Sequence, residues 1–188
     1  MKLELKKVSF SPSLSDETNA FTADVYIDGV KRATAENHGT GGPTNVCSYA
    51  KPRKSPQGDE EYFKESRANQ VFLDQYEAWT KQQPLIKTAL KMANGDDFTY
   101  AHSLETDVDL LLEEWIKAKY AKQDEERLKR MCKTKWVFTL TEDKGKPCDP
   151  NSMFSIPRKP TQTLAQLTKY LREEYGDNLK EIVNERYA

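Results

Sequence analysis

The chain has 188 residues, of which 37% are hydrophobic and 31% are charged. This balance is polar but suffices to bury a core, so it excludes a chain that is disordered throughout. The 29 basic and 30 acidic residues leave a formal charge of -1, which excludes a global electrostatic attraction to nucleic acid or to anionic membranes.

Residues 1–58 predict an antiparallel β-meander that ends in a loop rich in glycine and proline. Residues 3–10 form a candidate strand whose apolar positions change from odd to even numbers, which predicts a bulge near Lys6 and Lys7. Residues 21–27 alternate between apolar and polar side chains, a pattern typical of a strand with one buried face.

The Asp-Gly pair at residues 28–29 predicts a hairpin that leads into a strand over residues 30–36. A two-residue turn would set Asp24 opposite Ala33, which mixes a polar with an apolar side chain. A three-residue loop would set Asp24 opposite Arg32, an opposite-charge pair. We therefore expect the three-residue loop.

Residues 38–58 hold four of the eight glycines and three of the nine prolines without apolar periodicity, which predicts a long loop. Its start directly follows a strand, so exposed backbone N–H groups there would suit an anion, and a plain tight turn is the alternative. The basic residues that follow suit phosphate groups, with a tyrosine for stacking. The candidate ligand- or partner-binding residues are Asn37, His38, Gly39, Gly41, Gly42, Tyr49, Lys51, Arg53 and Lys54.

Helical spacing marks the central region, residues 59–133. Apolar residues from Tyr62 to Trp79 fall on one side of a helix that Pro84 interrupts. A shorter helix over residues 85–92 is expected next, ended by the following Asn-Gly pair.

A capping-box-like pair, Thr106 and Asp109, is expected to open a long charged helix that runs to about Lys133. Between Lys117 and Lys135 this helix holds eight basic residues against three acidic ones, which suits contacts with nucleic-acid phosphates. Its acidic start and basic end also match the helix dipole, so a solvated helix explains the same pattern.

The C-terminal region, residues 134–188, predicts a ββα(β) segment. Strands are expected at residues 136–141 and 153–156, then a helix capped by Thr161 or Thr163 and closed by Gly176. Residues 180–187 suit a strand or a helical turn, of which we prefer the strand. The regions 1–58, 59–133 and 134–188 are expected to pack as one compact α+β unit.

Catalytic and metal chemistry has weak support in the residue pattern. Cys47, Cys132 and Cys148 are odd in number and form no Cys-x-x-Cys pair, which favours reduced thiols in a cytoplasmic protein over a zinc site. His38 and His102 are expected to be solvated loop residues. No catalytic residue, metal or cofactor is expected. Neither a signal peptide nor a membrane-spanning segment is expected from the residue pattern.

The tail of a metal-dependent nuclease site is the remaining catalytic alternative. Glu142, Asp143 and Lys144 follow a predicted strand, where a carboxylate would hold a metal ion and a lysine would polarise a phosphate. Such triplets are also common in turns, and no partner acid is evident on an earlier strand.

Three motifs near the N-terminus resemble those of a known protein family. They are the Ser-x-Glu-Thr-Asn-Ala-Phe run at residues 15–21, the Asp-Gly hairpin at residues 28–29, and the Asn-x-Gly-x-Gly-Gly turn at residues 37–42. The segment resembles the opening of an uncharacterised family of small accessory proteins encoded by phages, prophages and plasmids. Family members often carry a histidine or aromatic cluster after the double glycine, where this chain has Pro43 to Cys47.

The resemblance implies a non-enzymatic binding protein in the cytoplasm of a bacterial host. Its expected partner is a host protein or an immune-defence protein, which it would inhibit. A nucleic-acid or nucleotide (phosphate) binding module and a metal-dependent nuclease remain the alternatives.

Overall fold

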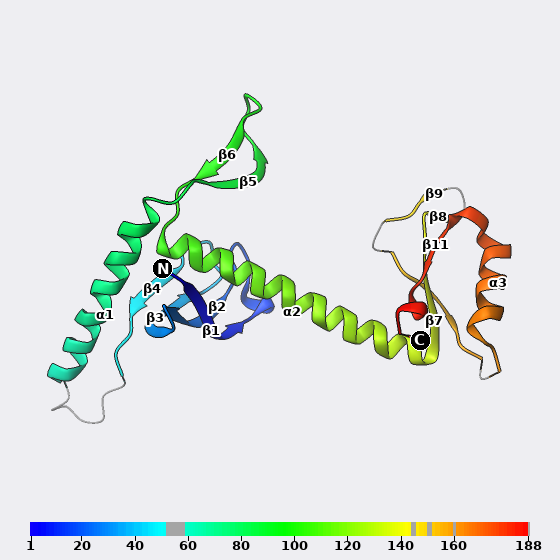
Figure 1. Ribbon diagram of the computed structural model, residues 1–188, viewed down its shortest axis with the longest axis horizontal. Coiled ribbons are helices and arrows are strands. Elements are labelled where there is room, and N and C mark those ends of the chain that lie inside the picture. The colour runs from blue at the N-terminus through cyan, green and yellow to red at the C-terminus, as the bar shows by residue number, and fades with distance from the viewer. Residues whose placement is uncertain (52–58, 144–145, 150–151, 160, 188) are drawn as a thin grey trace. The chain divides into compact units, whose positions relative to one another are not determined.

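The computed structural model describes residues 1–51, 59–143, 146–149, 152–159 and 161–187. The predicted α+β fold is confirmed, with an N-terminal antiparallel sheet, long helices and a C-terminal group of strands beside a further helix (Figure 1). Contacts divide the chain into two units, Met1–Lys117 and Ala118–Ala188. The long helix α2 (Leu104–Thr134) contributes residues to both units.

The N-terminal sheet is the predicted meander, with its strands in the order β1-β2-β3-β4. The strands are β1 (Leu3–Phe10), β2 (Phe21–Ile27), β3 (Val30–Asn37) and β4 (Asn45–Ser48). The predicted bulge in the first strand is confirmed, because the β1–β2 register shifts between Lys6 and Ser9. Lys7 lies there with φ of 51°, a conformation that such a bulge imposes.

The predicted three-residue hairpin loop is wrong. Ile27 pairs with Val30, so the turn holds only Asp28 and Gly29, with φ of 50° and 80°, as a type I′ turn requires. The extra residue is instead absorbed in β3, where the register shifts and leaves Arg32 bulged. This shift sets Ala33 opposite Val25 on the buried face, so burial of the core outweighs the cross-strand charge pair that predicted the longer loop.

The loop predicted for residues 38–58 is also wrong in part, because β4 pairs with the edge of β3. Val46 is half-buried against the core, whereas Asn45 and Cys47 are exposed. A strand this short carries too little apolar alternation to be recognised in the sequence, and the backbone hydrogen bonds to β3 define it.

Helix α1 (Asp59–Thr80) confirms the first predicted helix. The helix expected over residues 85–92 is wrong, because β5 (Ile86–Lys91) pairs there with β6 (Asp97–Tyr100). The Asn-Gly pair that would end a helix instead turns a hairpin, in which Gly95 has φ of 90°. Asn-Gly suits both roles, and the β-branched side chains of Ile86 and Thr88 favour the strand.

The N-terminus of α2 differs from the predicted capping box. Ser103 is the capping residue, since its Oγ accepts the backbone N–H of Thr106 at 3.1 Å. Thr106 therefore lies within the first turn of the helix. The serine precedes the expected cap by one turn and provides the same kind of bond.

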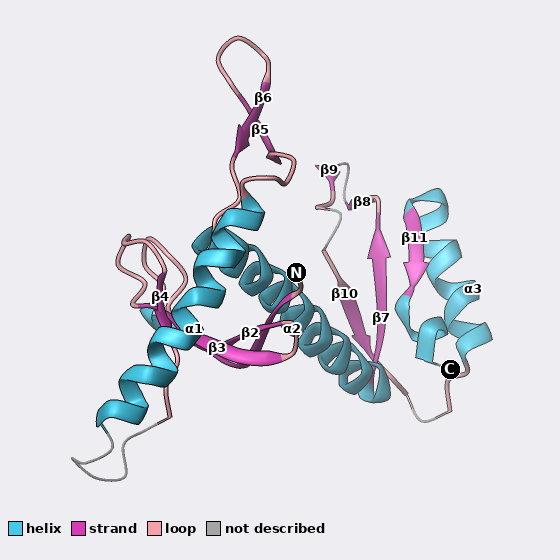
Figure 2. Cartoon of the chain, turned by 60° about the vertical axis from the view of Figure 1, so that its left-hand side comes forward, coloured by secondary structure: helices cyan, strands magenta, loops and turns pink. Residues whose placement is uncertain are grey.

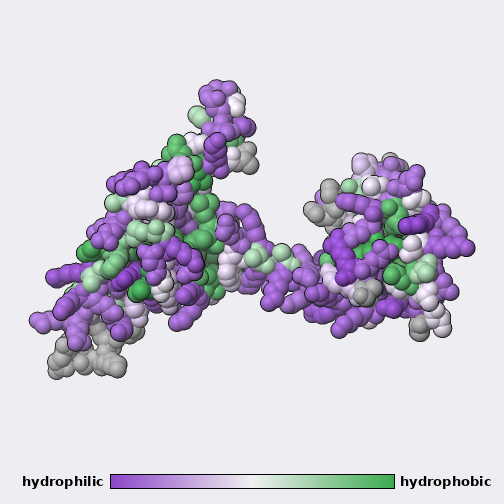
Figure 3. All heavy atoms as spheres, viewed as in Figure 1, coloured by the Kyte–Doolittle hydropathy of each residue, from purple (hydrophilic) through white to green (hydrophobic). Residues whose placement is uncertain are grey.

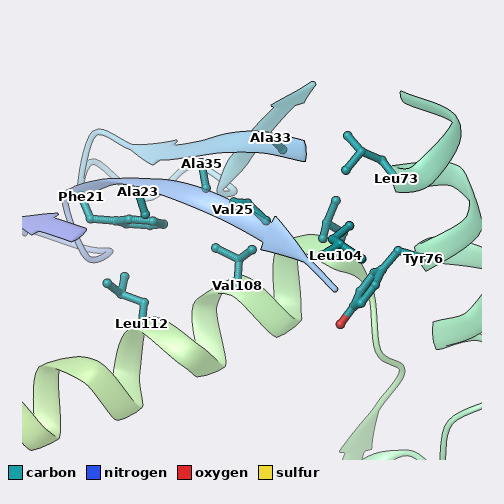
Figure 4. Packing of buried hydrophobic residues seen from close by; sticks show 11 residues of the cluster. Phe21, Ala23, Val25, Ala33, Ala35, Leu73, Tyr76, Leu104, Val108 and Leu112 are labelled. Carbon is teal, nitrogen blue, oxygen red and sulfur yellow. The ribbon is translucent and has the colours of Figure 1, made fainter. Parts of the chain in front are cut away.

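The core of the N-terminal unit lies between the sheet and the two helices. Figure 4 shows alternate side chains of β2 and β3 facing Leu73 and Tyr76 of α1 and Val108 and Leu112 of α2. The sheet contributes Phe21, Ala23, Val25, Ile27, Ala33 and Ala35, all of them buried. Small alanines on β3 beside larger residues on β2 let the helices approach the sheet closely.

The C-terminal unit is built on β7 (Lys135–Leu140), the central strand of the order β10-β7-β11 (Figure 2). Its partners β10 (Phe154–Pro157) and β11 (Leu179–Ile182) both run antiparallel to it. Two short strands, β8 (Glu142–Asp143) and β9 (Lys146–Pro147), pair beyond its end. The strands predicted at 136–141 and 153–156 are thus confirmed. Residues 180–187 divide between β11 and a 3₁₀ turn, Val183–Tyr187.

Strand β7 is buried on both faces. Phe138 packs with Leu167 and Leu171 of α3 (Leu164–Tyr175), while Val137 packs on the other side with Cys132 and neighbouring apolar residues. Of the two predicted caps of α3, Thr163 is the one used, in a full capping box with Gln166, and Gly176 closes the helix as predicted. Seen from one side, each unit carries hydrophobic surface between larger hydrophilic areas (Figure 3).

Candidate functional site

The glycine-rich turn after β3 is closed by one side chain. Asn37 Oδ1 accepts the backbone N–H of Gly39 at 2.8 Å and the hydroxyl of Thr18 at 2.9 Å. Its Nδ2 donates to the carbonyl of Gly42 at 3.0 Å. One asparagine therefore ties both ends of the turn to the segment that precedes β2.

The glycines allow this turn to lie directly on the segment between β1 and β2. The carbonyl of Gly39 accepts backbone N–H groups of Asp16 and Glu17 at 3.0 and 3.1 Å. A Cβ on Gly39 would lie 2.1 Å from the carbonyl oxygen of Leu14, and one on Gly41 would lie 2.1 Å from the Glu17 carboxylate. Both glycines also have positive φ. Close approach to a backbone atom and backbone conformation both require glycine at Gly39, whereas at Gly41 the Glu17 side chain can move and the backbone conformation is what requires glycine.

Two N–H groups of this turn are already used inside the protein. Gly39 donates to Asn37, and Gly41 donates to the Thr18 hydroxyl at 3.3 Å. These bonds support the tight-turn alternative at Gly39 and Gly41. His38 is exposed and a Cβ on Gly42 would meet open space, so a ligand role for these two residues stays a prediction.

The predicted binding residues beyond the turn contribute to the packing of α1 on the sheet. Tyr49 accepts a bond from Asn69 Nδ2 at 2.8 Å through its carbonyl, and its ring lies 3.9 Å below the Lys31 ammonium. The backbone N–H of Lys51 donates to Glu65 at 2.9 Å. Arg53 and Lys54 lie outside the described residues.

The bulged Arg32 adds a further polar contact between the sheet and α1. Its guanidinium lies 3.5 Å above the Phe72 ring and donates to Asn69 Oδ1 at 3.0 Å. The bulge in β3 thus has a structural use, because it aims an arginine at α1.

A polar cluster that the sequence did not reveal joins α1 to the first turns of α2. Asp107 is buried and binds His102 Nδ1 at 2.5 Å through one oxygen and the Tyr76 hydroxyl at 2.7 Å through the other. Burial and the bond to Asp107 raise the pKa of Tyr76 far above its usual value. His102 is therefore half-buried and paired, and the prediction of a solvated loop residue is wrong for it.

The predicted nuclease triplet lies at a hairpin. Glu142 and Asp143 form β8, and Lys144 lies outside the described residues. Within the described part of the chain, no group of three or more histidine, cysteine or acidic side chains could hold a metal ion. Cys47 is exposed, Cys148 is partly exposed and Cys132 is buried, and burial raises the pKa of the Cys132 thiol.

The β5–β6 hairpin presents the most unusual surface of the N-terminal unit. Figure 1 shows the two strands extending away from α1 and from the four-stranded sheet. Large side chains that would be expected in a core are exposed on it and just before it. These are Leu85, Leu90, Met92 and Phe98.

Strand pairing places several of these side chains on one face. Lys91 pairs with Asp97, and side chains alternate along a strand, so Phe98 projects to the opposite face from this charged pair. Met92 directly follows the last residue of β5, and its backbone N–H donates to the carbonyl of Asp96 at 2.8 Å, so the ladder continues and Met92 shares the face of Phe98. Tyr100, two residues after Phe98, shares that face, and the two rings lie 6.4 Å apart. Met92 is 49% exposed and Phe98 45% exposed, so the N-terminal unit leaves this face largely uncovered.

Comparisons of the chain with protein-family models, with curated protein sequences and with solved structures found no match. Among the described helices, none combines the length and the apolar character that crossing a membrane requires.

Proposed function

We propose that this chain is a non-enzymatic binding protein that docks onto another protein through the β5–β6 hairpin. The observation that carries this proposal is the exposed apolar face of the hairpin, formed by Met92 and Phe98 with the half-buried Tyr100 beside Phe98. Contiguous apolar surface of this kind is uncommon on a monomer and is typical of interaction sites.

The geometry supports a particular mode of docking. A two-stranded hairpin is marginally stable by itself, so a partner that covers one face stabilises it. Among the described strands, β5 and β6 pair only with each other, so each has an edge to which a strand of the partner can add. An apolar cleft beside a free strand edge is therefore the partner surface that fits. The resemblance of residues 15–42 to phage and plasmid accessory proteins makes a host protein or an immune-defence protein the partner that we propose.

The test compares the hairpin with other exposed apolar residues. The tagged chain, a Met92→Ser/Phe98→Ser variant and a Leu14→Ser/Val71→Ser control are each used to capture proteins from bacterial lysate. Leu14 and Val71 are 64% and 52% exposed, so the control removes comparable apolar surface elsewhere in the same unit. Captured proteins are quantified by mass spectrometry and then purified and remixed with the chain.

We expect one stoichiometric partner with the unmodified chain and with the control, and its loss with the hairpin variant. The free energies of unfolding of the three chains should agree within about 0.5 kcal/mol, because the changed residues are exposed. The absence of any stoichiometric partner, or equal capture by the hairpin variant, would contradict the proposal.

A further inference from the structure

A groove in the C-terminal unit has the composition of an anion site. It has a volume of about 500 Å³, within the range of small-molecule pockets. Three of its lining residues are cations, Lys129, Lys133 and Arg158, and none of the described lining residues is acidic. Its apolar lining includes Leu164 and Tyr187.

The cations differ in how far their charge is neutralised by the protein. Lys129 binds Glu125 at 2.7 Å on the same helix. For Lys133 and Arg158, no described carboxylate lies within ion-pair distance. Within the described part of the chain, two positive charges without an ion-pair partner therefore line one groove.

Arg158 is held in place by contacts within the C-terminal unit. Its backbone N–H donates to the carbonyl of Thr134 at 3.0 Å, immediately after β10 ends. Its guanidinium stacks 4.6 Å from the centre of the Trp136 ring, which is only 2% exposed. The indole N–H is in turn fixed by Gln162 at 2.9 Å. A stacked guanidinium keeps its N–H groups at the ring edge free for bidentate bonds to an oxyanion.

The floor of the groove is rigid. The buried Asn184 donates to the carbonyls of Cys132 and Lys135 at 3.1 and 3.0 Å, and it accepts the N–H of Val137 at 2.7 Å. One side chain therefore satisfies backbone hydrogen-bonding groups at the end of α2 and at the start of β7. A site whose walls are fixed in this way binds without a large ordering cost.

The helix dipole accounts for only part of this charge. Lysines near the C-terminus of α2 are favoured by the dipole whether or not a ligand binds. Arg158 belongs to the segment after β10 and bonds the carbonyl of Thr134, the last residue of α2, so the dipole favours its charge as well, but the dipole does not require its stacking on Trp136. The groove also adjoins Leu164, the first residue of α3, at the positive end of that helix.

We infer that this groove binds a phosphate ester of nucleotide size. Arg158 and Lys133 hold the phosphate, and the half-buried faces of Tyr187 and Leu164 receive the apolar or aromatic part of the ligand. The volume of the groove, about 500 Å³, suits one nucleotide and not a run of several nucleotides along a nucleic-acid strand.

The test titrates the full chain with adenosine monophosphate, adenosine, inorganic phosphate and a single-stranded oligonucleotide of about ten residues, by calorimetry and by ¹⁵N NMR. The altered site is Lys133→Gln/Arg158→Leu, in which leucine still covers Trp136. The matched control, Lys122→Gln/Arg127→Gln, removes the same charge from residues of α2 that do not line the groove. Circular dichroism verifies that both variants fold.

We expect adenosine monophosphate to bind more tightly than adenosine or phosphate and to shift the indole signal of Trp136. The groove variant should bind at least about tenfold more weakly, and the control should bind as the unmodified chain does. The inference is overturned if adenosine monophosphate does not bind at millimolar concentration or binds the groove variant equally well. Tighter, steeply salt-dependent binding of the oligonucleotide would also overturn it and would indicate a nucleic-acid surface.

Discussion

Gly39 belongs to a turn whose sequence resembles an anion-binding motif, but its backbone groups are used inside the protein. Glycine-rich turns after strands suit anions because they expose N–H groups, and the sequence alone leaves that use open. In the structure, the Gly39 N–H and carbonyl both bond within the protein. The two motifs at residues 15–21 and 37–42 are thus joined by hydrogen bonds, among them the bond from the Thr18 hydroxyl to Asn37.

Replacement of Gly39 by alanine should destabilise the N-terminal unit by about 2 kcal/mol or more, because the new Cβ meets a backbone carbonyl and φ is positive. Gly42→Ala is the control, since its Cβ would meet open space, and we expect a change within about 0.5 kcal/mol. Urea denaturation measures both. Equal stability of the two variants would show that the turn has no such constraint.

Individual residues could be predicted where local chemistry decides their role. The bulge at Lys6 and Lys7 and the stop at Gly176 follow from the residues themselves, and the sequence narrows the cap of α3 to Thr161 or Thr163, of which the structure uses Thr163. The pairing of His102 with Asp107 and Tyr76 could not be predicted, because Tyr76 comes from another helix and only the tertiary fold brings it near. The short spacing from His102 to Asp107 was the one local signal.

At the scale of elements, the sequence predicts long segments better than short ones. Helices α1 and α2 and strands β2 and β7 repeat their apolar pattern often enough to identify the structure. Residues 85–92 are short and apolar, a case in which periodicity does not separate helix from strand, and the pairing with β6 decides. The exposed face that forms the candidate docking site depends on that pairing, so it could not be predicted either.

Gly95→Ala should weaken the hairpin without unfolding the unit that carries it. Gly95 has φ of 90°, which alanine adopts only with strain, so β5 and β6 should open more often. We expect faster amide hydrogen exchange in residues 86–100 and unchanged exchange in β2. Equal acceleration in both would mean that the hairpin is part of the cooperative core of the unit.

At the scale of the whole molecule, the two units meet within a single helix. The boundary between Lys117 and Ala118 lies inside α2, and the residues from Ala121 to Arg127 are all exposed. Buried side chains return only at Leu128, in a core separate from that of the first unit. A helical stretch without buried side chains is stabilised by its own hydrogen bonds and by ion pairs such as Glu125 with Lys129, which are worth little in water.

Substitution of Asn184 by alanine tests how strongly this stretch couples the units. The change leaves the Cys132 and Lys135 carbonyls and the Val137 N–H without their partner, which should cost the C-terminal unit about 2–4 kcal/mol. Native-state hydrogen exchange should then show faster exchange in β7, β10 and β11 and unchanged exchange in β2 and β3. If the protection of β2 falls equally, the two units unfold together and the exposed part of α2 transmits stability between them. Unchanged exchange in the first unit would instead mean that each proposed binding site, the hairpin and the groove, rests on a core of its own.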